Sequence, residues 1–118
     1  MKISTIKELL DAEVLSCEEN LNCHVYSACG SDMMSDVLAY VKDQAVLLTG
    51  LVNSQVIRTA EMMDMKCVVF VRSKVPTAEM IELAKESGIV LMNSSKRMYE
   101  ACGILYSNGL IGNRVKNV

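Results

Sequence analysis

Two carboxylates stand four residues apart in the segment 31–36, with a serine between them. Positions i and i+4 share one face of a helix, so Asp32 and Asp36 would project from one side of its first turns, beside Ser35. Such a pair suits a hydrogen-bonding site or a Mg²⁺-linked polar site. Acidic side chains at a helix start also cap the helix and interact favourably with the positive end of its dipole. No third carboxylate stands at a spacing that completes a metal shell, so no metal is expected.

Polar side chains also follow three short apolar runs. The segments 49–54, 72–74 and 93–96 contain hydroxyls, amides and cations. If the runs are parallel strands, these turns lie along one sheet edge, where helix N-termini present free N–H groups to a phosphate or carboxylate. Alternatively, the amides and hydroxyls only cap helices and the cations are only solvated. The residues expected to bind a ligand are Asp32, Ser35, Asp36, Thr49, Asn53, Arg72 and Ser94.

The known phosphate and metal motifs do not accompany these residues. Neither G-x-x-x-x-G-K-[ST] nor G-x-G-x-x-G occurs, which disfavours a P-loop kinase and a dinucleotide dehydrogenase. Cys17, Cys23 and Cys29 recur every six residues, with His24 beside the second. Without a C-x-x-C pair, this spacing only places side chains on one face of extended chain. We therefore expect no metal and no cofactor.

The elements that must position these residues repeat a simple unit. Residues 45–49, 67–71 and 89–92 are apolar runs too short for helices, and each precedes an amphipathic segment of about 12 residues. This order predicts a βαβαβα core, which is an α/β fold with a mostly parallel sheet and flanking helices. Residues 24–29 are expected to form a strand before it. The right-handed crossover rule sets the hand of each unit but leaves the strand order open.

Cap residues predict where the larger helices begin and end. Three starts are expected, at Asn53 or Ser54, after Pro76-Thr77, and at Ser94 or Ser95. Gly88 is expected to stop the second of these helices, because glycine adopts the left-handed conformation that ends a helix. The last helix is expected to end near Gly109. Residues 1–109 would then form one domain, and residues 110–118 a flexible tail or a partner-binding arm.

Composition limits the class of protein. The chain has 118 residues, of which 51% are hydrophobic, enough for one compact domain. Its 14 acidic and 12 basic residues give a net charge of −2, so nucleic acid is not an expected partner. No apolar stretch approaches the roughly 18 residues that span a bilayer, and the first residues lack a signal-peptide centre. Five dispersed cysteines are typical of reduced, buried thiols. We expect a soluble cytoplasmic protein without a membrane partner.

Methionines are the most adaptable apolar residues of the chain. Nine occur beside one phenylalanine and no tryptophan. Core filling is their first explanation, but an adaptable surface for a partner or a second copy is an alternative. Because so small a chain has apolar surface to bury, we favour a homodimer. The methionines in question are Met33, Met34, Met62, Met63, Met65 and Met80.

Several segments together resemble the DRTGG domain family. They are residues 30–38 (GSDMMSDVL), residues 47–49 leading to Asn53, residues 67–71, Pro76 with Glu79, and residues 84–89. The chain departs from the family pattern at Ser27-Ala28, where a glycine pair is typical, and at Asn53, where a histidine is typical. The family resembles the amino-terminal domain of HPr kinase/phosphorylase. Its members occur alone or fused to phosphate acetyltransferases and CBS-domain pyrophosphatases, as regulatory or dimerising modules.

The resemblance and the absent catalytic motifs lead to one functional hypothesis. We expect a non-enzymatic regulatory module that dimerises and senses a small anionic ligand such as a nucleotide. The alternative is a small enzyme for a phosphorylated substrate, with Asp32 or Asp36 as base and Arg72 or Lys74 as clamp.

Overall fold

The computed structural model describes residues 1–41 and 44–112. The three apolar runs form strands β3 (Ala45–Thr49), β4 (Cys67–Phe70) and β5 (Val90–Asn93). Each is followed by a helix, α3 (Ser54–Met62), α4 (Ala78–Ser87) and α5 (Met98–Ser107). The predicted βαβαβα core is thereby confirmed. No helix in the described part of the chain is long and apolar enough to cross a membrane.

A further strand and helix precede this core, and a short N-terminal unit completes the sheet. These elements are α1 (Ile3–Leu9), β1 (Glu13–Val14), a short 3₁₀ helix (Glu18–Asn20), β2 (Ser27–Gly30) and α2 (Met34–Tyr40). The strand order is β1-β5-β4-β3-β2. Strands β2 to β5 are parallel, and β1 adds an antiparallel edge to β5. The mostly parallel sheet expected from the sequence is therefore present.

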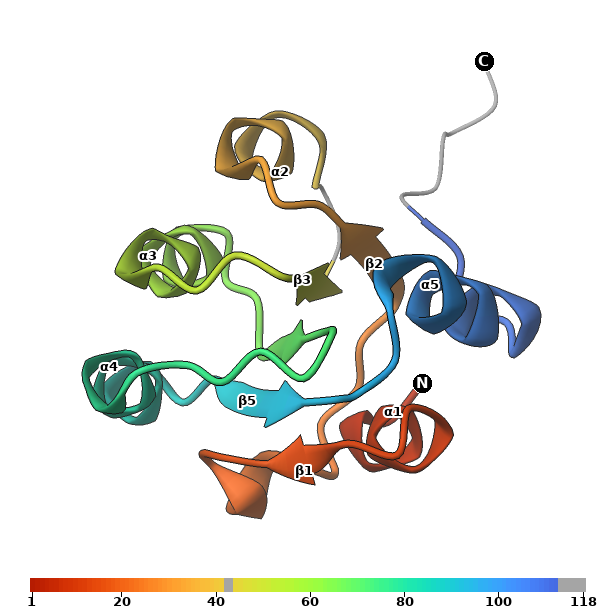
Figure 1. Ribbon diagram of the computed structural model, residues 1–118, viewed down its shortest axis with the longest axis horizontal. Helices are drawn as coiled ribbons and strands as arrows, with labels where there is room; N and C mark the ends of the chain where they lie inside the picture. The colour runs from red at the N-terminus through yellow and green to blue at the C-terminus, as the bar shows by residue number, and fades with distance from the viewer. Residues whose placement is uncertain (42–43, 113–118) are drawn as a thin grey trace.

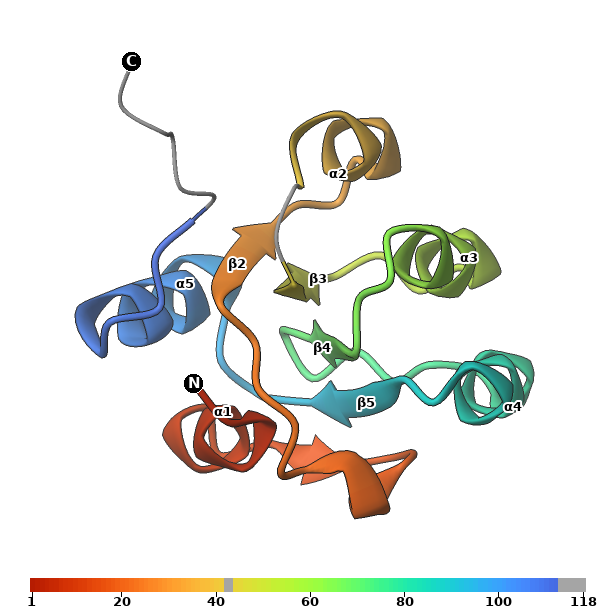
Figure 2. The ribbon, with the colours of Figure 1, turned by 180° about the vertical axis from the view of Figure 1, so that it is seen from behind.

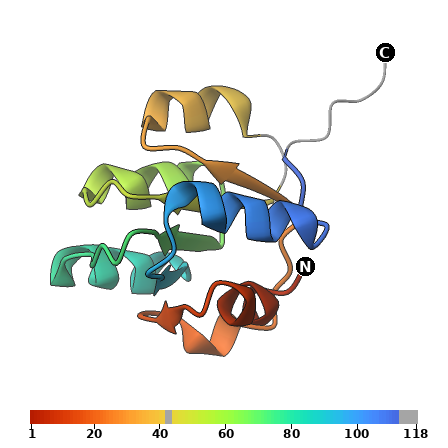
Figure 3. The ribbon, with the colours of Figure 1, turned by 45° about the vertical axis from the view of Figure 1, so that its right-hand side comes forward.

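The order of the parallel strands determines which helices cover which face. Because β2 to β5 follow one another across the sheet in one direction, right-handed crossovers place α2, α3 and α4 on the same face. Figure 1, and Figure 2 from behind, show α1 and α5 covering the opposite face. Figure 3 shows α2, α3 and α4 stacked in a row, with α5 on the other side of the strands. The fold is a three-layer α/β/α domain.

Burial on both faces explains why the central strands are continuously apolar. All five residues of β3 are buried. Ala45 and Leu47 pack with the cluster beneath α2, α3 and α4, whereas Val46 and Leu48 pack with α1 and α5. Successive strand residues point to opposite faces, so a strand between two helical layers needs apolar side chains at every position.

Two of the three predicted helix starts are confirmed. The Asn53 carboxamide accepts a hydrogen bond from Gln55 N at 2.7 Å and begins α3, and Thr77 accepts from Met80 N at 3.2 Å and begins α4. Gly88 ends α4 with a φ of 70°. The expected start of α5 at Ser94 or Ser95 is wrong, because the helix begins after Arg97.

The ends of the domain differ in detail from expectation. The strand expected at residues 24–29 forms later, at Ser27–Gly30, and His24 makes only an isolated bridge with Lys2. Leu110 is buried, and the Ile111 carbonyl accepts a hydrogen bond from Ala28 N at 3.1 Å. Residues 110–112 therefore pack on the domain. The rest of the predicted tail, residues 113–118, lies outside the described residues.

Candidate functional site

After β4 and after β5, the chain turns toward opposite faces of the sheet. These strands are neighbours in the sheet, yet the loop after β4 leads to α4 on one face and the loop after β5 leads to α5 on the other. In open α/β sheets, ligands bind in the crevice that opens where neighbouring loops diverge in this way, at the carboxyl ends of the strands. In this fold, the corresponding crevice lies between residues 71–77 and residues 94–97.

The two diverging loops are joined by main-chain hydrogen bonds. Arg72 N donates to Lys96 O at 2.8 Å, and Ser73 N donates to Ser94 O at 2.9 Å. Arg72 and Ser73 have φ values of 59° and 57°, a left-handed conformation that costs a non-glycine residue roughly 1–2 kcal/mol. Two strained residues in succession persist only where the surroundings hold them, and such positions cluster at functional sites.

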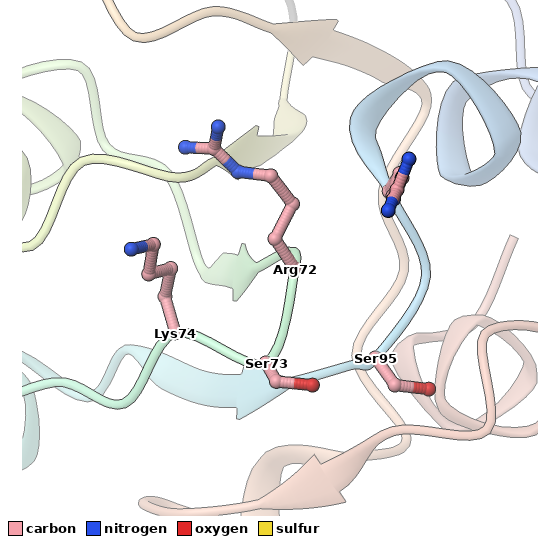
Figure 4. Close-up of a pocket in the computed structure, with 5 residues that line it drawn as sticks. Arg72, Ser73, Lys74 and Ser95 are labelled. Atoms are coloured by element: carbon pink, nitrogen blue, oxygen red, sulfur yellow. The ribbon is translucent and has the colours of Figure 1, made fainter.

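A basic depression of about 520 Å³ lies between these loops. Its five lining residues are three cations and two serines, namely Arg72, Ser73, Lys74, Ser95 and Arg97. Figure 4 shows the Ser73 and Ser95 hydroxyls pointing to the same side. Guanidinium, ammonium and hydroxyl groups all donate hydrogen bonds to oxyanions, and none of the five side chains is acidic. The basic depression therefore has the chemistry of a phosphate site.

A second polar cluster lies where β2 and β3 end. One carboxylate oxygen of Asp32 accepts a hydrogen bond from Thr49 Oγ1 at 3.0 Å and another from Gly50 N at 2.7 Å. Thr49 is fully buried, and its Oγ1 accepts from Leu51 N at 3.2 Å. We call this cluster, Asp32 with Thr49 and Gly50, the acidic corner. Its hydrogen bonds tie the loop before α2 to the loop before α3.

Arg72 connects the acidic corner with the basic depression. Its Nη2 lies 3.8 Å from the second carboxylate oxygen of Asp32. Its guanidinium also lies over Gly50, where a Cβ would clash with Nη2 and approach Cζ to 2.8 Å. Both charged side chains are about half exposed, 47% for Arg72 and 50% for Asp32, so solvent screens their attraction.

The structure brings together three of the seven residues expected to bind a ligand, Asp32, Thr49 and Arg72. Ser94 is buried beneath the loops, where its hydroxyl donates to Leu10 O at 2.6 Å and accepts from Lys96 N at 3.2 Å. Asn53 caps α3. Ser35 and Asp36 are exposed on α2, and within the described ranges neither side chain makes a hydrogen bond or ion pair.

Comparison with solved structures identifies the architecture. The chain superposes with a TM-score of 0.73 on a crystal structure of the CBS and DRTGG domains from the regulatory region of Clostridium perfringens pyrophosphatase. The fold is DRTGG-like. The match covers 88% of this chain and 45% of the pyrophosphatase chain, at 17% sequence identity. No protein-family model and no curated protein matches the sequence.

The matched structure contains a nucleotide. The pyrophosphatase regulatory region is complexed with its activator, diadenosine tetraphosphate. This DRTGG-like chain spans about 45% of that structure's chain. The likeness establishes the fold, and it is to a regulatory rather than a catalytic region.

The DRTGG-like domain also presents residues that the sequence-based list of ligand contacts omitted. Ser73, Lys74, Ser95 and Arg97 line the basic depression. The first three lie in the polar turns 72–74 and 93–96 that were expected at the sheet edge, but none was among the seven expected contacts, and Arg97 lies outside those turns. The useful signal is the position of these residues directly after two apolar runs. It becomes informative only when β4 and β5 are known to be neighbours whose loops diverge.

All five cysteines are free thiols, but the expected burial applies to only two of them, Cys17 and Cys67. Cys29 and Cys102 are partly buried, and Cys23 is exposed. Burial raises the pKa of the Cys67 and Cys102 thiols, and burial followed by the charges of Cys102 and Asp36 raises that of Cys29. A raised pKa lowers the population of the reactive thiolate. Among the described residues, no three histidine, cysteine or acidic side chains gather as a metal site would require.

Proposed function

We propose that this chain is a non-enzymatic regulatory module that senses a small anionic ligand, such as a nucleotide, through its phosphates. The observation that carries the proposal is the basic depression, which Arg72, Lys74 and Arg97 line together with two serines at the point of loop divergence. The acidic corner lacks this character, because its donors are already bonded to Asp32.

The physical chemistry of the basic depression favours phosphate over a neutral ligand. Guanidinium groups bind phosphate oxygens through parallel N–H bonds, and an ammonium adds a mobile point charge. The volume of about 520 Å³ lies within the range of small-molecule sites. The main-chain bonds from Arg72 N and Ser73 N fix the loops, so less ordering is needed when a ligand binds.

The matched structure provides independent support for a nucleotide. That regulatory region binds diadenosine tetraphosphate, a ligand with several adjacent phosphates. A basic depression with three cations suits a polyphosphate better than a single carboxylate, because each additional anionic group gains a partner.

The test is isothermal titration calorimetry with ATP, diadenosine tetraphosphate and inorganic triphosphate, and with adenosine as the uncharged comparison. Lys74→Met and Arg97→Met should each weaken binding of the phosphorylated ligands by about twofold to fivefold, the range for exposed charge pairs. Lys85→Met is the matched control, because Lys85 is an exposed lysine on α4. Equal affinities for all three variants and the wild type would refute the site.

Self-association is the second part of the proposed function. The outer face of α5 carries Tyr99 and Tyr106, which are 90% and 66% exposed, and apolar side chains between them line a groove of about 550 Å³. Exposed aromatic surface of this kind favours protein contacts. Sedimentation equilibrium should show a dimer that Tyr99→Glu converts to monomer. A monomeric wild type at all concentrations would refute this part.

Of the methionines considered for such a surface, Met34, Met65 and Met80 belong to the core, whereas Met33 and Met62 are exposed.

A further inference from the structure

We propose that the Arg72 guanidinium is held by an autoinhibitory contact with the acidic corner and turns toward the serine hydroxyls of the basic depression when an anion binds. This inference rests on the proposed function, since it concerns the regulation of the same site. It follows from one guanidinium that has two possible partners: the Asp32 carboxylate on one side and an incoming anion on the other.

The present position of Arg72 favours the acidic corner. Its guanidinium lies over Gly50 and 3.8 Å from Asp32. Figure 4 shows the side chain extending from the loop toward β3, while the Ser73 and Ser95 hydroxyls point the other way. The strongest phosphate-binding group of the loop is therefore turned away from the two hydroxyls with which it would share a ligand.

The contact that holds Arg72 is weak enough to exchange. Asp32 does not depend on Arg72 for its position, because its other oxygen is already fixed by Thr49 Oγ1 and Gly50 N. At 3.8 Å and about half exposed, the ion pair is long and screened by solvent. A phosphate in the basic depression offers the guanidinium two oxygens in place of one distant one.

Only the side chain has to move. The backbone of Arg72 and Ser73 is fixed to the loop after β5 by hydrogen bonds of 2.8 and 2.9 Å. The movement leaves the Asp32 carboxylate without its cation. The hydrogen bonds of this carboxylate link the loop before α2 to the loop before α3. Anion binding after β4 is thus coupled to the acidic corner. By linkage, a ligand that displaces Arg72 from Asp32 strengthens anion binding by the same factor by which the anion strengthens the binding of that ligand.

Gly50→Ala tests this coupling without changing any charge. The new Cβ clashes with Arg72 Nη2, the far end of a flexible side chain, so the guanidinium is displaced while the backbone is retained. We expect ATP to bind Gly50→Ala about 1.5-fold to fivefold more tightly than the wild type. This range corresponds to the strength of an exposed ion pair such as that between Arg72 and Asp32, which the substitution removes. Gly112→Ala is the matched control, because a Cβ there would make only an ordinary contact, 3.9 Å from Ala28 O.

The gain in affinity must depend on Arg72. In an Arg72→Met background, Gly50→Ala should give no gain, as a double-mutant cycle would show. Asp32→Asn is the second variant if Gly50→Ala does not fold, and its gain should likewise disappear in Arg72→Met. Unchanged or weaker binding by Gly50→Ala, or a gain that persists without Arg72, overturns the inference. If Lys74→Met and Arg97→Met also leave ATP affinity unchanged, it is the proposed function that has failed.

Discussion

The acidic corner and the basic depression lie on the same edge of one sheet but differ in how their polar groups are used. In the acidic corner, one Asp32 oxygen accepts hydrogen bonds from a buried hydroxyl and from a main-chain N–H. Both donors are therefore already bonded within the domain. In the basic depression, the loop backbones bond to each other and their charged side chains line open space.

The difference shows that a polar residue in a turn is not by itself a binding residue. Ser94 and Asn53 stand at positions typical of ligand contacts, yet each supplies an acceptor that the domain needs, Ser94 to Lys96 N and Asn53 to Gln55 N. Buried N–H and C=O groups must find partners, and short side chains near strand ends are the nearest available. Binding groups are those that remain after this requirement has been met.

Ser94 and Ser95 provide the largest expected contrast, because they are adjacent serines with opposite surroundings. Ser94→Ala leaves the buried Leu10 carbonyl without its donor and should lower the free energy of unfolding by about 1–3 kcal/mol in urea denaturation. Ser95 is exposed and lines the basic depression. Ser95→Ala should change stability by less than about 0.5 kcal/mol.

The same pair should reverse its order when ligand binding is measured. Removing a hydroxyl donor should weaken ATP binding to Ser95→Ala by about twofold to tenfold. Calorimetry should show a smaller change for Ser94→Ala. Loss of stability at Ser95, together with loss of binding at Ser94, would invert the comparison between the two regions.

Asn53→Ala should give an intermediate effect, on stability alone. It removes the side-chain acceptor of Gln55 N at the start of α3, which should cost about 1 kcal/mol in the free energy of unfolding. Asn53→Asp retains an acceptor and serves as its control. The ATP dissociation constant of folded Asn53→Ala should equal that of the wild type. A tenfold loss of affinity without loss of stability would place the ligand at α3 instead.

Asp36→Asn should give the smallest effect. Asp36 lies in the first turn of α2 and is exposed, and its favourable interaction with the helix dipole is worth about 0.3 kcal/mol. Thermal melting should therefore detect almost no change. Abolished ATP binding at an unchanged melting temperature would restore Asp36 as a ligand contact.

The fold could be predicted to a large extent from periodicity. The buried strands β3 and β4 are readable because burial on both faces requires every residue to be apolar. Gly88 and Thr77 mark the ends of α4 by local chemistry alone. The start of α5 could not be read in this way. Serine is a typical cap residue, but the Ser94 hydroxyl is buried and donates a hydrogen bond to Leu10 O, 84 residues earlier in the chain.

The candidate site was predicted less completely. That Asp32, Thr49 and Arg72 meet at one edge follows from the parallel arrangement of their strands. The omission of Ser73, Ser95 and Arg97 has a different cause. Their proximity depends on β4 and β5 being neighbours and on α4 and α5 lying on opposite faces, which are properties of strand order. Local spacing does not encode strand order.

The most direct test of the central claim is a titration of the ¹⁵N-labelled protein with ATP, followed by amide chemical shifts. The account predicts the largest changes at residues 72–74 and 95–97, with a smaller change at Gly50, whose amide is bonded to Asp32. Changes concentrated at the starts of α2 and α3, with residues 72–74 and 95–97 unaffected, would contradict it.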